Sequence, residues 1–200
     1  MQPERCLLHQ EVIRCLSQDD SLGMTPTAFR QGGADTLIQF AIAECSLGSV
    51  LVARSPKGIC TITFGDGPDS LLKNLQDQFP KAELIGSDPG FEQVVAQVIG
   101  LIEQPDTPFD LPLDIRGTAF QQRIWNMLRT IPAGTTVSYT QLVEMIDSPK
   151  SVRAVANACG QNMIAVAIPC HRVVRLDGDI SGYRWGIDRK RALLAREASD

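Results

Sequence analysis

The sequence predicts two unlike halves: an α/β half with a three-stranded antiparallel sheet, then a mostly α-helical half that contains a helix-turn-helix. Three observations lead to this fold class. Short apolar runs separated by turn residues fill residues 36–65, and apolar residues at helical spacing dominate after residue 118. A segment with three prolines and no helical period, residues 105–114, lies between the two patterns and marks the expected linker.

The predicted sheet depends on three strand-like runs, which are TLIQFAIAEC, SVLVAR and GICTITFG. The breaks between them, SLG and SPKG, have the composition of tight turns, so the runs are expected to form an antiparallel meander. Two helical stretches, PDSLLKNLQDQF and GFEQVVAQVIGLIEQ, follow the meander. The first half is therefore expected to be a small α/β unit.

The second half opens with a helix that starts at Thr118 and places Phe120, Ile124, Leu128 and Ile131 on one face. Trp125 in this helix, like Trp185 further on, is assigned to the core, because large aromatic residues in a compact chain are mostly buried.

Two further helices are expected to form the helix-turn-helix. The segment SYTQLVEMI opens with Ser138, and Gln141 three residues later completes a capping box. The segment DSPKSVRAVANACG follows after about four residues. Lys150 and Arg153 lie near its start, where a recognition helix presents side chains to DNA.

The charge distribution favours a nucleic-acid partner for the second half. The net charge of the whole chain is −4. Residues 1–111 carry 7 Lys and Arg against 15 Asp and Glu, whereas residues 112–200 carry 12 against 8. A basic half of this kind suits the phosphates of a nucleic acid, although solvated acidic and basic faces would give the same asymmetry. No apolar run has the length of a membrane span, and the N-terminus lacks the pattern of a signal peptide, so a cytoplasmic protein is expected.

The six cysteines do not predict a disulfide framework or a zinc site. None forms a C-x-x-C pair, and the chain has only two histidines. One of these histidines stands directly after a cysteine in the stretch IPCHRVV, where Cys170, His171 and Arg172 are consecutive. A thiolate is the reactive form of cysteine, and neighbouring cationic side chains lower the pKa of the thiol. Cys170 is therefore a candidate nucleophile, with Glu197 a candidate to orient His171.

The residues alone leave several chemistries open for Cys170. A cysteine hydrolase would use a histidine remote in sequence, for which His9 is the remaining choice. A redox thiol would need a resolving partner, and Cys159 is eleven residues away. A methyltransferase with a soluble methyl donor would need a glycine-rich loop, for which FGDGPD is too weak a signal.

The sequence resembles the O6-alkylguanine-DNA alkyltransferases. Two stretches carry the resemblance: GTAFQQRIWNMLRTIPAGTTVSYTQL, and RAVANACGQNMIAVAIPCHRVV with the later SGYRWG and LLAREA. Within the family the chain is most similar to the C-terminal half of the bacterial adaptive-response (Ada) members. MTPTAFRQGG resembles the end of an AraC-type DNA-binding segment.

The resemblance implies a ribonuclease H-like α/β domain over residues 35–111 and a DNA-binding, alkyl-accepting domain with a winged helix-turn-helix over residues 112–200. Residues 1–34 would be a partial helical leader. The implied activity is that of a methylated-DNA–protein-cysteine S-methyltransferase. It would flip O6-methylguanine out of duplex DNA from the minor groove and move the methyl group irreversibly to Cys170, once per molecule. The alternative is a DNA-binding transcriptional regulator of the alkylation response.

The resemblance also assigns roles to individual residues. His171 would deprotonate Cys170 through a water, Glu197 would hold His171, and Asn162 would brace the turn that carries the cysteine. The expected DNA and base contacts are Tyr139, Ser138, Lys150, Arg153, Arg172, Val173, Ser181 and Gly182. Among these, Tyr139 would act on the leaving guanine and Arg153 would fill the stack in its place. A monomer is expected, with duplex DNA as its partner and with no metal, no cofactor and no membrane association.

Overall fold

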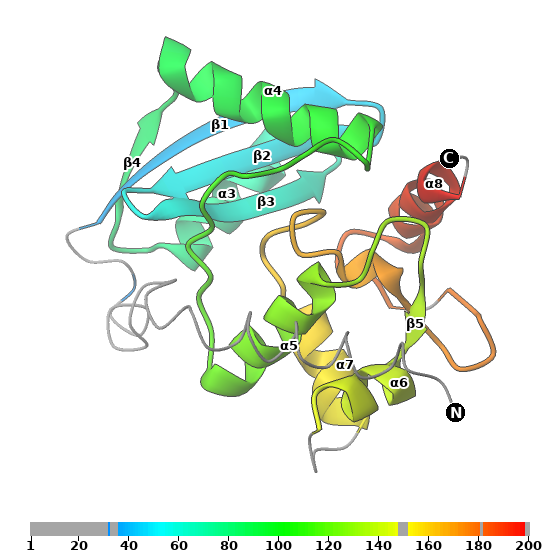
Figure 1. Ribbon diagram of the computed structural model, residues 1–200. Helices are drawn as coiled ribbons and strands as arrows, with labels where there is room; N and C mark the ends of the chain where they lie inside the picture. The colour runs from blue at the N-terminus through cyan, green and yellow to red at the C-terminus, as the bar shows by residue number, and fades with distance from the viewer. Residues whose placement is uncertain (1–31, 33–35, 148–151, 181, 199–200) are drawn as a thin grey trace.

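The structure is a computed structural model that describes residue 32 and residues 36–147, 152–180 and 182–198 of the 200-residue chain. Figure 1 shows a sheet with a helix on each face in the first half and a group of helices in the second half. The expected leader, residues 1–34, lies outside the described residues except for Gly32. Within the described residues, no helix is both long enough and apolar enough to span a membrane.

The expected antiparallel meander is confirmed. It consists of β1 (Leu37–Cys45), β2 (Gly48–Ser55) and β3 (Gly58–Gly65), with β2 between the other two. Four consecutive residues of β2, from Val50 to Ala53, have no exposed surface. Both faces of this central strand are therefore covered.

The sheet has four strands rather than the three that the sequence predicts, because β4 (Glu83–Gly86) pairs in parallel with β1. The sequence ELIG is too short to show the alternation that identifies a strand. It reaches the edge of the sheet because the preceding helix crosses one face and returns the chain beside β1. A parallel neighbour needs such a crossover.

Two helices cover the sheet, as the helical periodicity predicts. Helix α3 (Pro68–Gln78) packs on one face, where its Leu71 and Leu75 join Leu51 of the sheet. Helix α4 (Pro89–Glu103) covers the other face and begins at Asp88, whose side chain accepts a hydrogen bond from the Phe91 N–H. Figure 1 shows α4 lying across the sheet with α3 behind it.

The second half contains short elements arranged around an apolar core. They are α5 (Ala119–Arg129), β5 (Val137–Ser138), α6 (Tyr139–Met145), α7 (Val152–Gly160), η1 (Cys170–Arg172), β6 (Val173–Val174) and α8 (Ile187–Glu197). The predicted capping box of Ser138 and Gln141 is present. Thr118 and Gln121 form a second one at the start of α5. Trp125 and Trp185 are buried, as expected.

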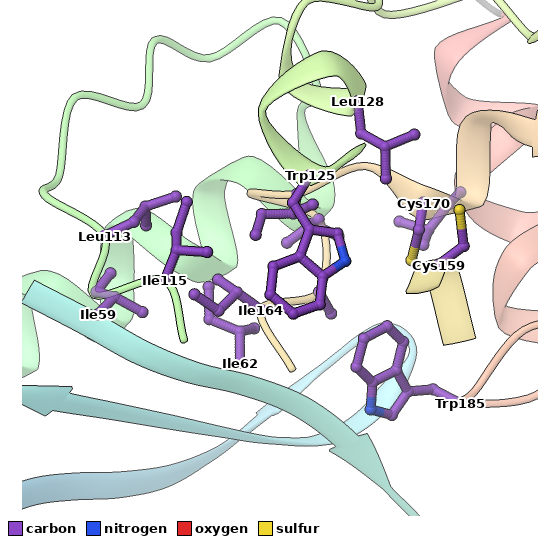
Figure 2. Close-up of a cluster of buried hydrophobic side chains, with 14 of the residues drawn as sticks. Ile59, Ile62, Leu113, Ile115, Trp125, Leu128, Cys159, Ile164, Cys170 and Trp185 are labelled. Carbon is purple, nitrogen blue, oxygen red and sulfur yellow. The ribbon is translucent and has the colours of Figure 1, made fainter. Parts of the chain in front are cut away.

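The two halves share backbone hydrogen bonds as well as a core. The Ile62 N–H of β3 donates to the carbonyl of Met163, and the Ala165 N–H donates to the carbonyl of Ile62. Ile62 and Ile164 thereby form an isolated parallel bridge. Figure 2 shows the side chains of Ile62, Ile164 and Trp125 in one cluster. The edge strand of the sheet thus fixes the segment that leads to Cys170.

The expected linker, residues 105–114, also docks on β3 at its end. The Ile59 N–H donates to the carbonyl of Pro112, and the Asp114 N–H donates to the carbonyl of Ile59. Gly58 permits this approach: its φ is +147°, and a Cβ at this position would lie 2.3 Å from the Pro112 oxygen. The connection therefore continues the edge of the sheet before it enters the second half.

Candidate active site

Cys170 lies at the first position of a one-turn 3₁₀ helix, η1, at the edge of the central core. The residue is 6% exposed. The Val173 N–H donates to the Cys170 carbonyl and closes this turn, and Val173 then pairs with Val137 of β5. The nucleophile candidate is therefore held in a short turn that is anchored by a strand pair immediately after it.

The loop before Cys170 is shaped by one residue in a strained conformation. Val166 has a φ of +59°, in the left-handed region that β-branched residues rarely adopt. Hydrogen bonds on both sides hold it there, from the Ala167 N–H to the Ala165 carbonyl and from the Ile168 N–H to the Ile164 carbonyl. Such strain persists where the surrounding structure determines the conformation, and it is common near functional sites.

Asn162 connects this loop to the cysteine. Its side chain is buried and its Nδ2 lies 2.9 Å from the Ile168 carbonyl, 3.3 Å from the Ile164 carbonyl and 3.3 Å from the Cys170 sulfur. Its Oδ1 accepts a hydrogen bond from the Ile164 N–H. The structure thus places Asn162 inside the turn that carries Cys170, in contact with the sulfur itself.

His171, Glu197 and Arg172 form a buried cluster beside the turn. His171 Nε2 lies 2.8 Å from Glu197 Oε1, and Arg172 contacts both oxygens of the same carboxylate at 2.8–3.1 Å. The Gly134 N–H also donates to Glu197 Oε2. Glu197 lies at the end of α8, so this helix brings the carboxylate to a histidine 26 positions earlier in the chain.

The electrostatics of the cluster determine which nitrogen of His171 carries a proton. Hydrogen bonds and charge from His171 and Arg172 outweigh burial and lower the pKa of Glu197 to about 2, so it is an anion that can only accept. Burial lowers the pKa of His171 below its ordinary value, which favours the neutral ring. Nε2 then donates to Glu197, and Nδ1 is left as the basic atom. Nδ1 is buried and has no hydrogen-bond partner among the described residues.

The sequence predicts a lowered pKa for Cys170, but in the structure the pKa is raised. Burial raises the pKa of Cys170 to about 11, although the Asn162 hydrogen bond and the charge of Lys190 act in the opposite direction. The guanidinium of Arg172, one of the two cations that the sequence offers, is bound to Glu197. Cys170 is therefore a neutral thiol that needs a base, and the neutral ring of His171 is the adjacent one.

Tyr139 lies at the first position of α6 and is half-buried. Burial raises the pKa of its hydroxyl to about 12, with a further contribution from Cys159 and Cys170, so the group is a proton-bearing donor at neutral pH. A Cβ placed on Gly182 would lie 3.9 Å from the Tyr139 hydroxyl. The loop after β6 therefore lies against Tyr139, and the assignment of both residues to base contacts stays a prediction.

The remaining expected DNA contacts are spread over several elements. Arg153 is exposed in the first turn of α7, whereas Ser138 is buried and uses its hydroxyl to cap α6. Arg172 was expected at the DNA, but its guanidinium is largely buried and bound to Glu197. Lys150 and Ser181 lie outside the described residues.

Sequence reasoning missed Lys190, which lies in α8 and has no exposed surface. Its Nζ donates to the Val173 carbonyl at 2.6 Å. Its spacing in the sequence could have predicted this burial. Lys190, Leu193 and Glu197 are three and four residues apart, so they fall on one face of the helix. Within the described residues, no three His, Cys, Asp or Glu side chains lie together as metal ligands would.

Comparison with known proteins gives two matches to domain families that together cover most of the chain. Residues 38–115 match the family described as 6-O-methylguanine DNA methyltransferase, ribonuclease-like domain. Residues 119–199 match the family described as 6-O-methylguanine DNA methyltransferase, DNA binding domain.

Two curated relatives illustrate the range of similarity. The chain is 55% identical over 182 residues to the bifunctional transcriptional activator/DNA repair enzyme Ada of Escherichia coli, covering 91% of this chain and 51% of that protein. It therefore spans about half the length of this relative. It is 44% identical over 150 residues to the methylated-DNA–protein-cysteine methyltransferase of Mycobacterium tuberculosis, covering 72% of this chain and 89% of that protein.

Solved structures show the same fold. The crystal structure of Mycobacterium tuberculosis OGT in complex with DNA matches with a TM-score of 0.67 and 35% identity, over 80% of this chain and 93% of that chain. The crystal structure of Mycobacterium tuberculosis O6-methylguanine methyltransferase matches with a TM-score of 0.66 and 35% identity, over 82% of this chain and 94% of that chain.

Proposed function

Because this chain belongs to the 6-O-methylguanine DNA methyltransferase family, we propose that it repairs O6-methylguanine in duplex DNA by moving the methyl group to Cys170, once per molecule. One observation carries the proposal. A buried cysteine directly precedes, in the chain, a neutral histidine whose Nε2 is bound to an ionised carboxylate, so that Nδ1 is left basic. This is the nucleophile, base and orienter arrangement of covalent catalysis.

The transfer begins with loss of the Cys170 proton to His171 Nδ1 through a water molecule. The thiolate sulfur attacks the methyl carbon, the S–C bond forms and the bond between the methyl carbon and guanine O6 breaks. Guanine leaves with that electron pair and takes up a proton. Tyr139 is suited to donate a hydrogen bond to the leaving base, because its raised pKa keeps the hydroxyl protonated. The product is a thioether, which water does not reverse, so each molecule acts once.

The helices α6 and α7 would serve as the DNA-binding element. They follow one another in the chain and pack together, and the exposed Arg153 lies near the start of the second. A methylated base inside the duplex is out of reach of a buried sulfur, so the base must be flipped out at a cost of a few kcal/mol. In the proposal α7 enters the minor groove and Arg153 fills the space that the base leaves.

Asn162 and Arg172 are positioning residues in this proposal. Asn162 holds the turn of Cys170 through the Ile168 carbonyl, and Arg172 holds Glu197 in place for His171. The DNA contacts of Ser138, Val173, Gly182, Lys150 and Ser181 remain predictions, as do the monomeric state and the cytoplasmic location. A role in transcription also remains a prediction, and it is based on the similarity to the E. coli activator.

The test is to weigh the intact chain after incubation with duplex DNA that contains O6-methylguanine. We expect a gain of one methyl group that stops at one per chain and is absent from Cys170→Ala. Cys159→Ala is the matched control, because it removes a second buried cysteine of the same core and should still gain one methyl. No gain in the unaltered chain, with DNA still bound, would contradict repair and favour a purely regulatory protein.

A further inference from the structure

Lys190 is a buried amine that the mechanism above does not use. It has no exposed surface, and its Nζ donates to the Val173 carbonyl at 2.6 Å. The N–H of the same Val173 donates to the Cys170 carbonyl. Val173 therefore links the Lys190 ammonium to the turn that carries the nucleophile.

The ionisable groups that face Lys190 come from two other elements. Burial lowers the pKa of Lys190, while Cys170 of η1 and Cys159 of α7 raise it. Lys190 in turn acts on its neighbours: its positive charge lowers the pKa of the Cys159 and Cys170 thiols and the pKa of His171. Figure 2 shows Cys159 and Cys170 close together at the edge of the core. The ammonium thus acts on the nucleophile and on its base at the same time.

Proton transfer from Cys170 to His171 through a water creates two opposite charges among buried side chains. Glu197 lies 2.8 Å from the ring that becomes positive. Lys190 is the charged residue that lowers the pKa of the sulfur that becomes negative. Charges already in place stabilise a developing ion pair without reorganisation, and in a buried site they act more strongly than in water.

We propose that Lys190 is the positioning residue that stabilises the Cys170 thiolate, as the fourth member of an alternating array of charges. The array runs from the Glu197 carboxylate to the His171 imidazolium, the Cys170 thiolate and the Lys190 ammonium. No bond to Lys190 forms or breaks, and it keeps its proton throughout. The inference rests on the proposed function for the reaction that uses the thiolate, but thiol reactivity tests it without DNA.

Three variants separate the charge of Lys190 from its hydrogen bond. Lys190→Met removes both, Lys190→Gln keeps a donor for the Val173 carbonyl without charge, and Lys190→Arg keeps the charge. Each is treated with chloroacetamide between pH 6 and 9, and the label on the Cys170 peptide is followed by mass spectrometry. Cys159→Ala serves as a background in which the neighbouring thiol is absent. Thermal unfolding confirms that each variant is folded.

We expect Lys190→Met and Lys190→Gln to slow labelling of Cys170 about tenfold, which equals about one pKa unit of lost thiolate stabilisation. Their plots of rate against pH should move about one unit to the alkaline side, while Lys190→Arg stays close to the unaltered chain. Lys190→Gln carries the test alone if Lys190→Met does not fold.

Two outcomes would overturn the inference. Equal labelling rates in the unaltered chain and in folded Lys190→Gln would show that the role of Lys190 is its hydrogen bond. Slow labelling in Lys190→Arg alone would show that side-chain shape matters rather than charge. Failure of the unaltered chain to take a methyl group from DNA would instead reject the proposed function, and the labelling rates would still decide the role of Lys190.

Discussion

Two buried arginine–carboxylate pairs lie in different regions of this molecule and serve different ends. Asp114 and Arg116 lie 2.8 Å apart where the chain leaves the sheet, and Glu197 and Arg172 lie 2.8 Å apart in the site. Both carboxylates are almost fully buried. Distance and burial alone do not distinguish the two pairs.

The third partner distinguishes them. Asp114 accepts a hydrogen bond from the Ser55 hydroxyl at 2.6 Å, and the Arg116 guanidinium stacks over the Phe79 ring at 4.4 Å. Neither the serine hydroxyl nor the phenylalanine ring exchanges a proton near neutral pH. Glu197 instead binds His171, which does. In this molecule, the buried ion pair that we assign to proton transfer is the one whose carboxylate also binds a group that can exchange a proton.

Glu197→Gln is expected to have the largest effect of the changes that test this comparison. It removes the negative charge that stabilises the His171 imidazolium during transfer. Loss of a general base typically slows a reaction by about 10²–10⁴-fold; Glu197 acts through the base His171, so we expect single-turnover methyl transfer to slow by an amount at the lower end of that range. The measurement is the rate of methyl uptake from DNA with the protein in excess. A rate within about threefold of the unaltered chain would show that Glu197 only supports the fold.

Asp114→Asn should affect stability and leave the chemistry intact. Removing one partner of a buried ion pair typically costs about 3–5 kcal/mol, because the other charge remains buried without compensation. We expect a loss of this size in the free energy of unfolding in urea. The folded fraction should still take up methyl at nearly the unaltered rate. A rate as low as that of Glu197→Gln would remove the distinction between the two pairs.

The smallest expected effect is the pH dependence that His171 introduces. Burial lowers the pKa of His171 in the folded chain, so methyl transfer should hold its neutral-pH rate below pH 6.5 and weaken only in stronger acid. The unfolded ring takes up a proton that the folded ring does not, so the free energy of unfolding should fall as pH drops below about 6.5.

Rates of methyl uptake and urea denaturation at several pH values between 5 and 8 check both parts. The His171→Asn chain is the control for stability, since it should lose the dependence in this window. A methyl-transfer rate that is already halved at or above pH 6.5 would contradict a lowered pKa.

Much of the fold could be predicted from local patterns. The meander, the helices α3, α4 and α5 and the capping box at Ser138 follow from periodicity and turn chemistry, which act over a few residues. The strand β4 could not be found this way, because four residues show no period and its pairing with β1 is decided by the crossover through α3.

The site was predictable where its residues are adjacent in sequence, as Cys170 and His171 are. The place of Glu197 near them came from a family resemblance, since sequence spacing does not show which residues α8 brings to the turn. Lys190 and the raised pKa of Cys170 were missed for one reason. Both depend on burial by segments that are remote in the chain, and burial decides whether a charge is stabilised or excluded.

The bridge between Ile62 and Ile164 has a consequence for how this protein can be divided. A cut within residues 105–111 would leave the nucleophile on one fragment and the strand that supports its loop on the other. The fragment with Cys170 would keep Asn162 and the β5–β6 pair but lose the two backbone hydrogen bonds to Ile62, so we expect its loop to be held less firmly until the fragments reassociate. Methylation of Cys170 is irreversible in the proposed reaction. Methyl uptake that depends on both fragments would therefore mark their association covalently, as in a split-protein reporter.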